Sequence, residues 1–90
     1  TRKARAAADK GRARSERPKR LSYNERRELD GIEDAILGAE TAVEEAHAVV
    51  ADPEVAADPA RLHKACEALH EAEQEVERLY GRWAELDERR

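Results

Sequence analysis

Two stretches of the chain carry apolar residues at alternating spacings of three and four. The first stretch contains Leu29, Ile32, Ile36, Ala39, Val43, Ala46 and Val50. The second contains Leu62, Ala65, Leu69, Ala72, Val76, Leu79, Trp83 and Leu86. This spacing is that of the a and d positions of a heptad, which face a partner helix in a coiled coil. Each stretch therefore predicts a long amphipathic helix with one narrow apolar stripe.

The ends of both helices are marked by capping residues. Ser22 and Glu25 have the spacing of a capping box, in which each side chain binds the backbone N–H of the other residue. Asp-Pro occurs twice, at 52–53 and 58–59, and Asp before Pro favours a helix start. We expect helices over about 23–51 and 59–88, with a single short turn of helical or 3₁₀ type within 52–58.

Gly31 and Gly38 lie inside the first predicted helix, away from its apolar stripe. Each should weaken the helix by up to about 1 kcal/mol relative to alanine.

Two apolar stripes joined by a short reversal should pack against each other in antiparallel fashion. The expected fold is therefore all-α: a two-helix antiparallel coiled-coil hairpin over residues 21–90. Glu28 and Arg82 should form an exposed ion pair, while Glu40 should meet Glu73, an unfavourable contact that favours a local shift in register. The stripe pairs that this alignment predicts are Val50 with Leu62, Val43 with Leu69, Ile36 with Val76, and Leu29 with Trp83.

All three aromatic residues are expected at the open end of the hairpin, away from the turn. A hydrophobic cluster is predicted there from Tyr23, Tyr80, Trp83, Leu21, Leu29 and Leu86. The cluster would serve either as a clasp between the helix ends or as a docking surface for a neighbouring domain. As the largest apolar side chain, Trp83 is expected to matter most for stability.

Charge divides the chain into two parts. Residues 1–20 carry nine Lys/Arg against two Asp/Glu, a net +7, whereas residues 21–90 carry eight against nineteen, a net −11. The only apolar side chains of residues 1–20 are alanines, and Gly11 and Pro18 interrupt any helix. We expect a basic, mostly disordered arm or linker.

The basic arm has two interpretations, a solvated tether or a phosphate-binding segment. Clustered guanidinium and ammonium groups displace counterions from a nucleic acid. Because the arm has no aromatic residues, it should contact the phosphate backbone of the nucleic acid with little sequence preference. The predicted nucleic-acid-binding residues are Arg2, Lys3, Arg5, Lys10, Arg12, Arg14, Arg17, Lys19, Arg20, Arg26 and Arg27.

Catalysis is not expected in this chain. No glycine-rich phosphate loop is present, and a two-helix hairpin has no interior in which to shift the pKa values of paired acids. His47, His63, Cys66 and His70 are of the residue types that bind zinc, but His63 and His70 are about 10 Å apart along a helix, too far to share one ion. We expect solvated histidines and no metal site, with a His47–Cys66 pair plus one neighbour as the alternative. The lone cysteine fits a reducing compartment, and no apolar run reaches membrane-spanning length.

The order of several short motifs resembles the C-terminal coiled-coil domain of ABC-F ATPases of the Uup type. The motifs are Lys19-Arg20-Leu21-Ser22-Tyr23-Asn24-Glu25, Arg27-Glu28-Leu29, the Asp-Pro-Glu turn at 52–54, and Arg82-Trp83-Ala84-Glu85-Leu86-Asp87. The resemblance covers roughly residues 19–88.

The resemblance implies a non-catalytic accessory domain that has no cofactor of its own. Its parent would be a cytoplasmic protein whose ATPase domains use ATP and magnesium, and those domains would be its partners together with DNA or ribosomal RNA. The acidic hairpin departs from a nucleic-acid-binding surface, so contact is expected through the basic arm, Arg26 and Arg27. The alternative is a protein-interaction or spacer hairpin without nucleic-acid binding.

Overall fold

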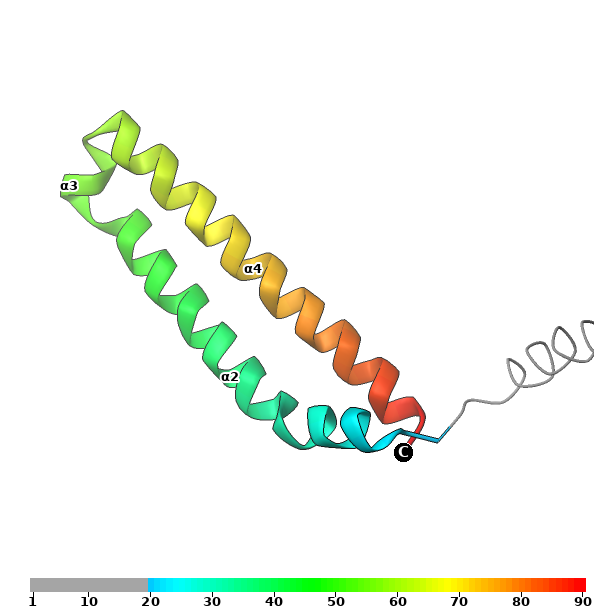
Figure 1. Cartoon of the computed structure of the whole chain (residues 1–90). Helices are drawn as coiled ribbons and strands as arrows, with labels where there is room; N and C mark the ends of the chain where they lie inside the picture. The colour runs from blue at the N-terminus through cyan, green and yellow to red at the C-terminus, as the bar shows by residue number, and fades with distance from the viewer. Residues whose placement is uncertain (1–19) are drawn as a thin grey trace, which may run out of the picture.

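The protein is an antiparallel helical hairpin, as expected (Figure 1). The computed structural model describes residues 20–90, and the predictions for residues 1–19 lie outside it. Helix α2 (Tyr23–Ala51) and helix α4 (Pro59–Glu88) form the two arms, and helix α3 (Pro53–Ala56) joins them at the tip. The C-terminus lies at the open end, beside the start of α2 (Figure 1).

The helices begin at the predicted capping residues. The Oγ of Ser22 accepts a hydrogen bond from the N–H of Glu25 at 3.1 Å, and the Glu25 carboxylate accepts one from the N–H of Ser22 at 3.0 Å. The capping box is thus confirmed. Asp58 caps α4 by accepting from the N–H groups of Ala60 and Arg61 at 3.0 and 3.3 Å.

The tip is a single α-helical turn and not a 3₁₀ turn. The N–H groups of Ala56 and Ala57 bond to carbonyls four residues earlier, those of Asp52 and Pro53, at 2.9 and 3.0 Å. Val55 of α3 is only 6% exposed. It shares a hollow with Val49 at the end of α2 and Ala65 near the start of α4, so it packs against both arms and closes the tip.

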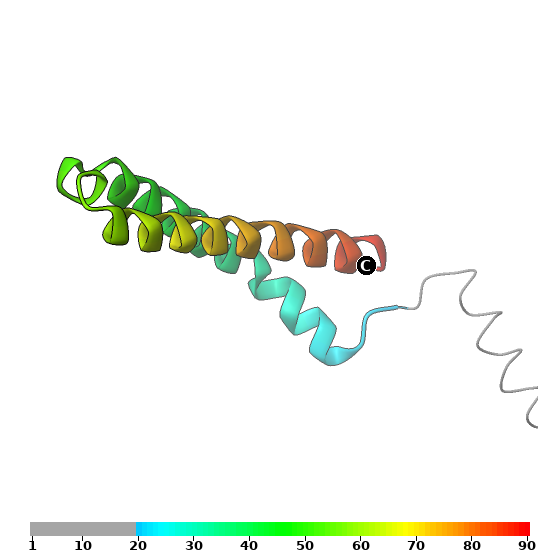
Figure 2. The ribbon, with the colours of Figure 1, turned by 90° about the horizontal axis from the view of Figure 1, so that it is seen from above.

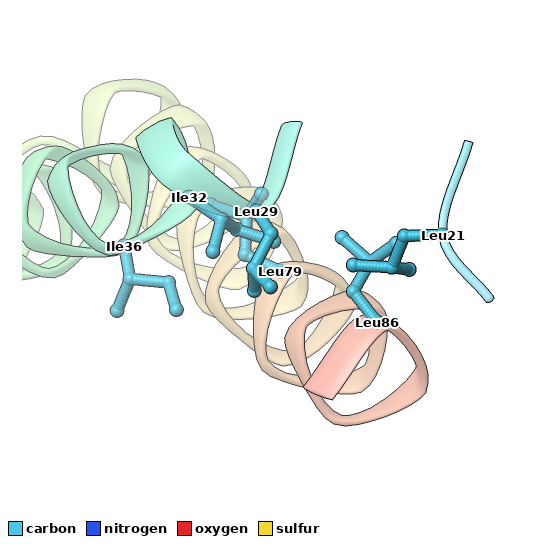
Figure 3. Close-up of a cluster of buried hydrophobic side chains, with 6 residues drawn as sticks. All are labelled: Leu21, Leu29, Ile32, Ile36, Leu79 and Leu86. Carbon is cyan, nitrogen blue, oxygen red and sulfur yellow. The ribbon is translucent and has the colours of Figure 1, made fainter. Parts of the chain in front are cut away.

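The predicted apolar stripes form the contact between α2 and α4. Every stripe position is buried or half-buried, and the buried ones are Leu29, Ile32, Ile36, Ala65, Leu79 and Leu86. The main core lies toward the open end, where Leu21, which precedes α2, faces Leu86 (Figure 3). On the α2 side the stripe positions toward the tip are alanine and valine, which are smaller than the leucine and isoleucine of the open end and only half-buried.

Helix α2 bends between its first turns and the rest of its length. Viewed from above, the cyan first turns run away from the direction of α4, and the green remainder runs alongside it (Figure 2). Gly31 and Gly38 both lie within α2, and neither has a positive φ. A Cβ added at either would meet nothing within 4 Å, so no close approach requires a glycine at these positions.

The polar contacts across the middle of the hairpin differ from the expected pairing. Glu40 accepts a hydrogen bond from the hydroxyl of Tyr80 at 2.8 Å, and His47 lies 3.9 Å from Glu73. Both partners, Tyr80 and Glu73, lie closer to the C-terminus of α4 than the simple alignment predicts. Glu40 and Glu73 still line one hollow. Tyr80 is the neighbour of Glu40 and His47 is the neighbour of Glu73, and these contacts relieve the repulsion between the two carboxylates.

Within residues 20–90, no helix contains an apolar stretch that is long enough to cross a bilayer.

Candidate nucleic-acid interface

The described part of the predicted basic interface lies where residues 1–19 join the hairpin. Arg20, Arg26 and Arg27 are all exposed there, at or just before the first turns of α2. Within residues 20–90 none of the three lies within 4.0 Å of a carboxylate oxygen. The structure thus brings these three cations to one end of the molecule, while the other predicted phosphate-binding residues lie outside the described part: Arg2, Lys3, Arg5, Lys10, Arg12, Arg14, Arg17 and Lys19.

An exposed aromatic ring accompanies these cations. The guanidinium of Arg27 lies 5.9 Å from the ring centre of Tyr23, within the range of a cation–π contact, and its Nη1 donates to the Tyr23 hydroxyl at 3.5 Å. Tyr23 is 73% exposed. The pair therefore presents a flat aromatic face and a fixed positive charge to solvent, a combination suited to stacking on an unpaired base.

The prediction of an aromatic cluster in the core was wrong for both tyrosines. Tyr23 and Tyr80 are exposed, and the core of the open end is built from leucine and isoleucine with Trp83 only partly buried against it. Stepping the apolar stripe backward from Leu29 reaches positions 25 and 22, so Tyr23 is off the stripe. This signal is present in the sequence.

The four arginines from residue 78 to the C-terminus are paired with carboxylates. Arg82 binds Glu28 and Glu85, and Arg89 binds Glu25 at 2.6 Å. Arg78 and Arg90 each bind an acid three residues earlier, Glu75 and Asp87. The hydrogen bond from the backbone N–H of Ser22, with that from Arg89, lowers the pKa of Glu25 to about 2. Arg82 lowers the pKa of Glu28, whose carboxylate in turn raises the pKa of Arg82. Arg82 and Arg89 therefore brace the two arms of the hairpin, and all four arginines present little free positive charge.

The body of the hairpin is acidic. From residue 28 to residue 60 the chain has ten Asp/Glu and no Lys or Arg. A nucleic acid would be repelled along this length, because its phosphates and these carboxylates carry the same charge. A nucleic-acid contact would therefore be disfavoured along α2 beyond its first turns.

The histidines and the cysteine do not assemble into a metal site in the part of the chain described. His63 lies 3.3 Å from Glu67 of the next turn, His47 lies near Glu73, and Cys66 is exposed. No three potential ligands come together within residues 20–90, and no polar or charged side chain there is buried.

Comparison with protein families gives a match to the model of the ABC transporter C-terminal domain over residues 20–88. The chain belongs to the ABC transporter C-terminal domain family. Comparison with curated proteins gives no match, and comparison with solved structures gives none either. The family match confirms the ABC transporter C-terminal domain that the motifs at the helix starts and ends indicated, and it covers both arms of the hairpin.

Proposed function

We propose that this C-terminal domain is a non-catalytic accessory domain of a cytoplasmic ABC-F ATPase of the Uup type, and that its basic end binds nucleic-acid phosphates. ATP and magnesium would be bound by the ATPase domains of such a parent. The observation that carries the proposal is positive charge in the sequence that leads into the hairpin: residues 1–20 contain nine Lys/Arg, and the exposed Arg26 and Arg27 follow in the first turns of α2.

The two ends of the domain would have different roles. Lys and Arg side chains of the basic end neutralise phosphates and release counterions, which gives binding with little sequence preference. The Arg27–Tyr23 pair adds a stacking face for an unpaired base, which favours branched or single-stranded regions of DNA or ribosomal RNA over intact duplex. The acidic hairpin would project away from the nucleic acid as a rigid strut.

Salt dependence of binding tests this proposal. We would measure gel shifts of the full chain with duplex DNA, branched DNA and structured RNA over a range of salt concentrations. The variant with Arg12, Arg14, Arg17, Lys19 and Arg20 replaced by glutamine should bind more weakly. Its log–log salt slope should fall by about one unit for each phosphate that is no longer neutralised.

A control variant replaces two arginines that already have carboxylate partners. The double variant Arg78→Gln with Arg90→Gln removes positive charge from α4 and the C-terminus, and it should leave the salt slope nearly unchanged. Equal affinity and equal slope for the five-residue variant and the parent would show that residues 1–20 are only a tether.

A second function, protein binding by the hairpin, is favoured by one specific observation. Leu37 and Tyr80 are 62% and 46% exposed although both are large and apolar or aromatic, and they line the same groove.

A further inference from the structure

A groove crosses the side of the hairpin between α2 and α4, above the main core. It has a volume of about 290 Å³, and its lining combines four apolar or aromatic side chains with two glutamates: Ile36, Leu37, Tyr80, Trp83, Glu33 and Glu40. The groove is separate from the basic end, where Arg20 and Arg26 lie at or before the start of α2.

Two large side chains of this groove stay exposed to solvent in the hairpin. Leu37 lies off the apolar stripe of α2 and is 62% exposed, and Tyr80 follows the stripe residue Leu79 and is 46% exposed. Trp83 is half-buried, so part of its indole faces the groove. Burial of such side chains by a partner would remove apolar surface from water, which is the main source of affinity at protein interfaces.

The charge in the groove selects the partner. The Tyr80 hydroxyl donates to the Oε2 of Glu40 at 2.8 Å, which fixes that carboxylate beside the aromatic lining. Within residues 20–90 neither Glu33 nor Glu40 forms an ion pair with a Lys or Arg, whereas Glu25, Glu28 and Glu75 all do. These two carboxylates are therefore left to pair with cations from outside the hairpin.

We propose that this groove docks a basic, amphipathic segment of a partner protein, with an arginine seated between Glu33, Glu40 and the indole of Trp83. Arginine fits better than lysine, because its planar guanidinium binds carboxylates in a fork and stacks on aromatic rings. Apolar residues next to that arginine pack on Leu37. This proposal goes beyond nucleic-acid binding and does not depend on it, since two carboxylates exclude a phosphate from the groove.

Trp83 is the only tryptophan of the chain, so its fluorescence reports on the groove directly. The probe is a short synthetic amphipathic peptide of Arg, Leu and Ala, added to the full chain. We expect a saturable change in Trp83 emission. A peptide with glycine in place of leucine keeps the charge, and one with glutamate in place of arginine keeps the apolar residues; both should bind much more weakly.

Matched variants separate the groove from diffuse attraction to an acidic protein. Glu33→Gln combined with Glu40→Gln should weaken the peptide about tenfold. Glu45→Gln combined with Glu71→Gln makes the same change in net charge outside the groove and should weaken it far less. Leu37→Ser should also reduce affinity, with Val49→Ser as its control, because both side chains are exposed and neither substitution should unfold the hairpin.

Four outcomes would overturn the proposal. If the two double glutamine variants weaken peptide binding equally, the attraction is diffuse charge and not the groove. If duplex DNA changes Trp83 emission in the same way as the peptide, the groove is a nucleic-acid surface. Trp83 emission that depends on protein concentration alone would identify a second copy of the chain as the occupant. A shift in emission without peptide, when Arg12, Arg14 and Arg17 are changed to Gln, would identify the chain's own basic arm.

Discussion

Arg82 of α4 holds Glu28 of α2 in a two-pronged ion pair, with Nε donating to one carboxylate oxygen at 2.7 Å and Nη2 to the other at 2.9 Å. The same guanidinium donates through Nη1 to Glu85 at 3.1 Å. Forked pairs of this kind have fixed geometry as well as favourable charge. The pair, which the sequence predicts, ties the two helices together beside the core of the open end.

A double-mutant cycle measures this tie. Arg82→Gln and Glu28→Gln should each lower the melting temperature, and the double variant should be destabilised by less than the sum of the two, because the two single changes remove the same pair. The coupling should shrink at high salt, since both side chains are partly exposed. Strictly additive effects at low salt would mean that the pair contributes nothing to stability.

Stability should also depend on pH through Glu25. Its pKa is lowered from 4.5 to about 2, first by the N–H of Ser22 and then by Arg89. A carboxyl with a lower pKa in the folded chain stabilises it fully above its unfolded pKa. That contribution is lost as the pH falls from about 4.5 toward about 2.

Glu25→Gln removes this carboxyl, so the variant should lose less stability than the parent over that pH range, measured by thermal melts monitored by circular dichroism. Glu45→Gln is the control, because Glu45 is exposed and takes part in neither the capping box nor an ion pair within residues 20–90. A Glu25→Gln variant with the same pH dependence as the parent would contradict the prediction.

The helices and their contact face could be predicted because local rules determine them. Ser22, Asp52 and Asp58 provide caps whose hydrogen bonds lie within three residues. Apolar residues spaced alternately by three and four positions form one stripe on each helix, and the two stripes face each other. Both signals are contained in short windows of sequence. The position of Arg82 opposite Glu28 followed from the same alignment.

The details that could not be predicted depend on packing between distant segments. Val55 looks like one apolar residue in a polar turn, and only the meeting of α2, α3 and α4 buries it. Across the hairpin, Glu40 also reaches Tyr80 and His47 reaches Glu73, contacts that the spacing of the apolar stripes did not predict. The groove proposed as a docking site is lined by side chains of both helices, so the pattern of either helix alone did not indicate it.

Leu86→Ala should be the most damaging substitution of a single side chain. Leu86 is 0% exposed and packs in the same cluster as Leu21 and Leu79, whereas Trp83, the residue expected from the sequence, is only half-buried. Truncating a fully buried leucine costs about 2–5 kcal/mol in free energy of unfolding. Trp83→Ala should cost less than Leu86→Ala in urea unfolding monitored by circular dichroism. The reverse order would place the indole at the centre of the core.

Replacing the glycines of α2 should raise the stability of the hairpin. Gly38 lies in the helix with no positive φ, and an added Cβ meets no atom within 4 Å. Gly38→Ala should therefore raise the free energy of unfolding by up to about 1 kcal/mol, because alanine restricts the unfolded chain and fits the helix. Gly31→Ala should act similarly, since its surroundings are equally open.

Ala48→Gly is the matched reverse substitution, at an exposed position of the same helix, and it should lower stability by a comparable amount. Circular dichroism melts of the three variants give the comparison. If Gly31→Ala lowers stability while Gly38→Ala raises it, the bend of α2 needs a glycine at position 31. The first turns of α2, which carry Arg26 and Arg27, would then owe their direction to that residue.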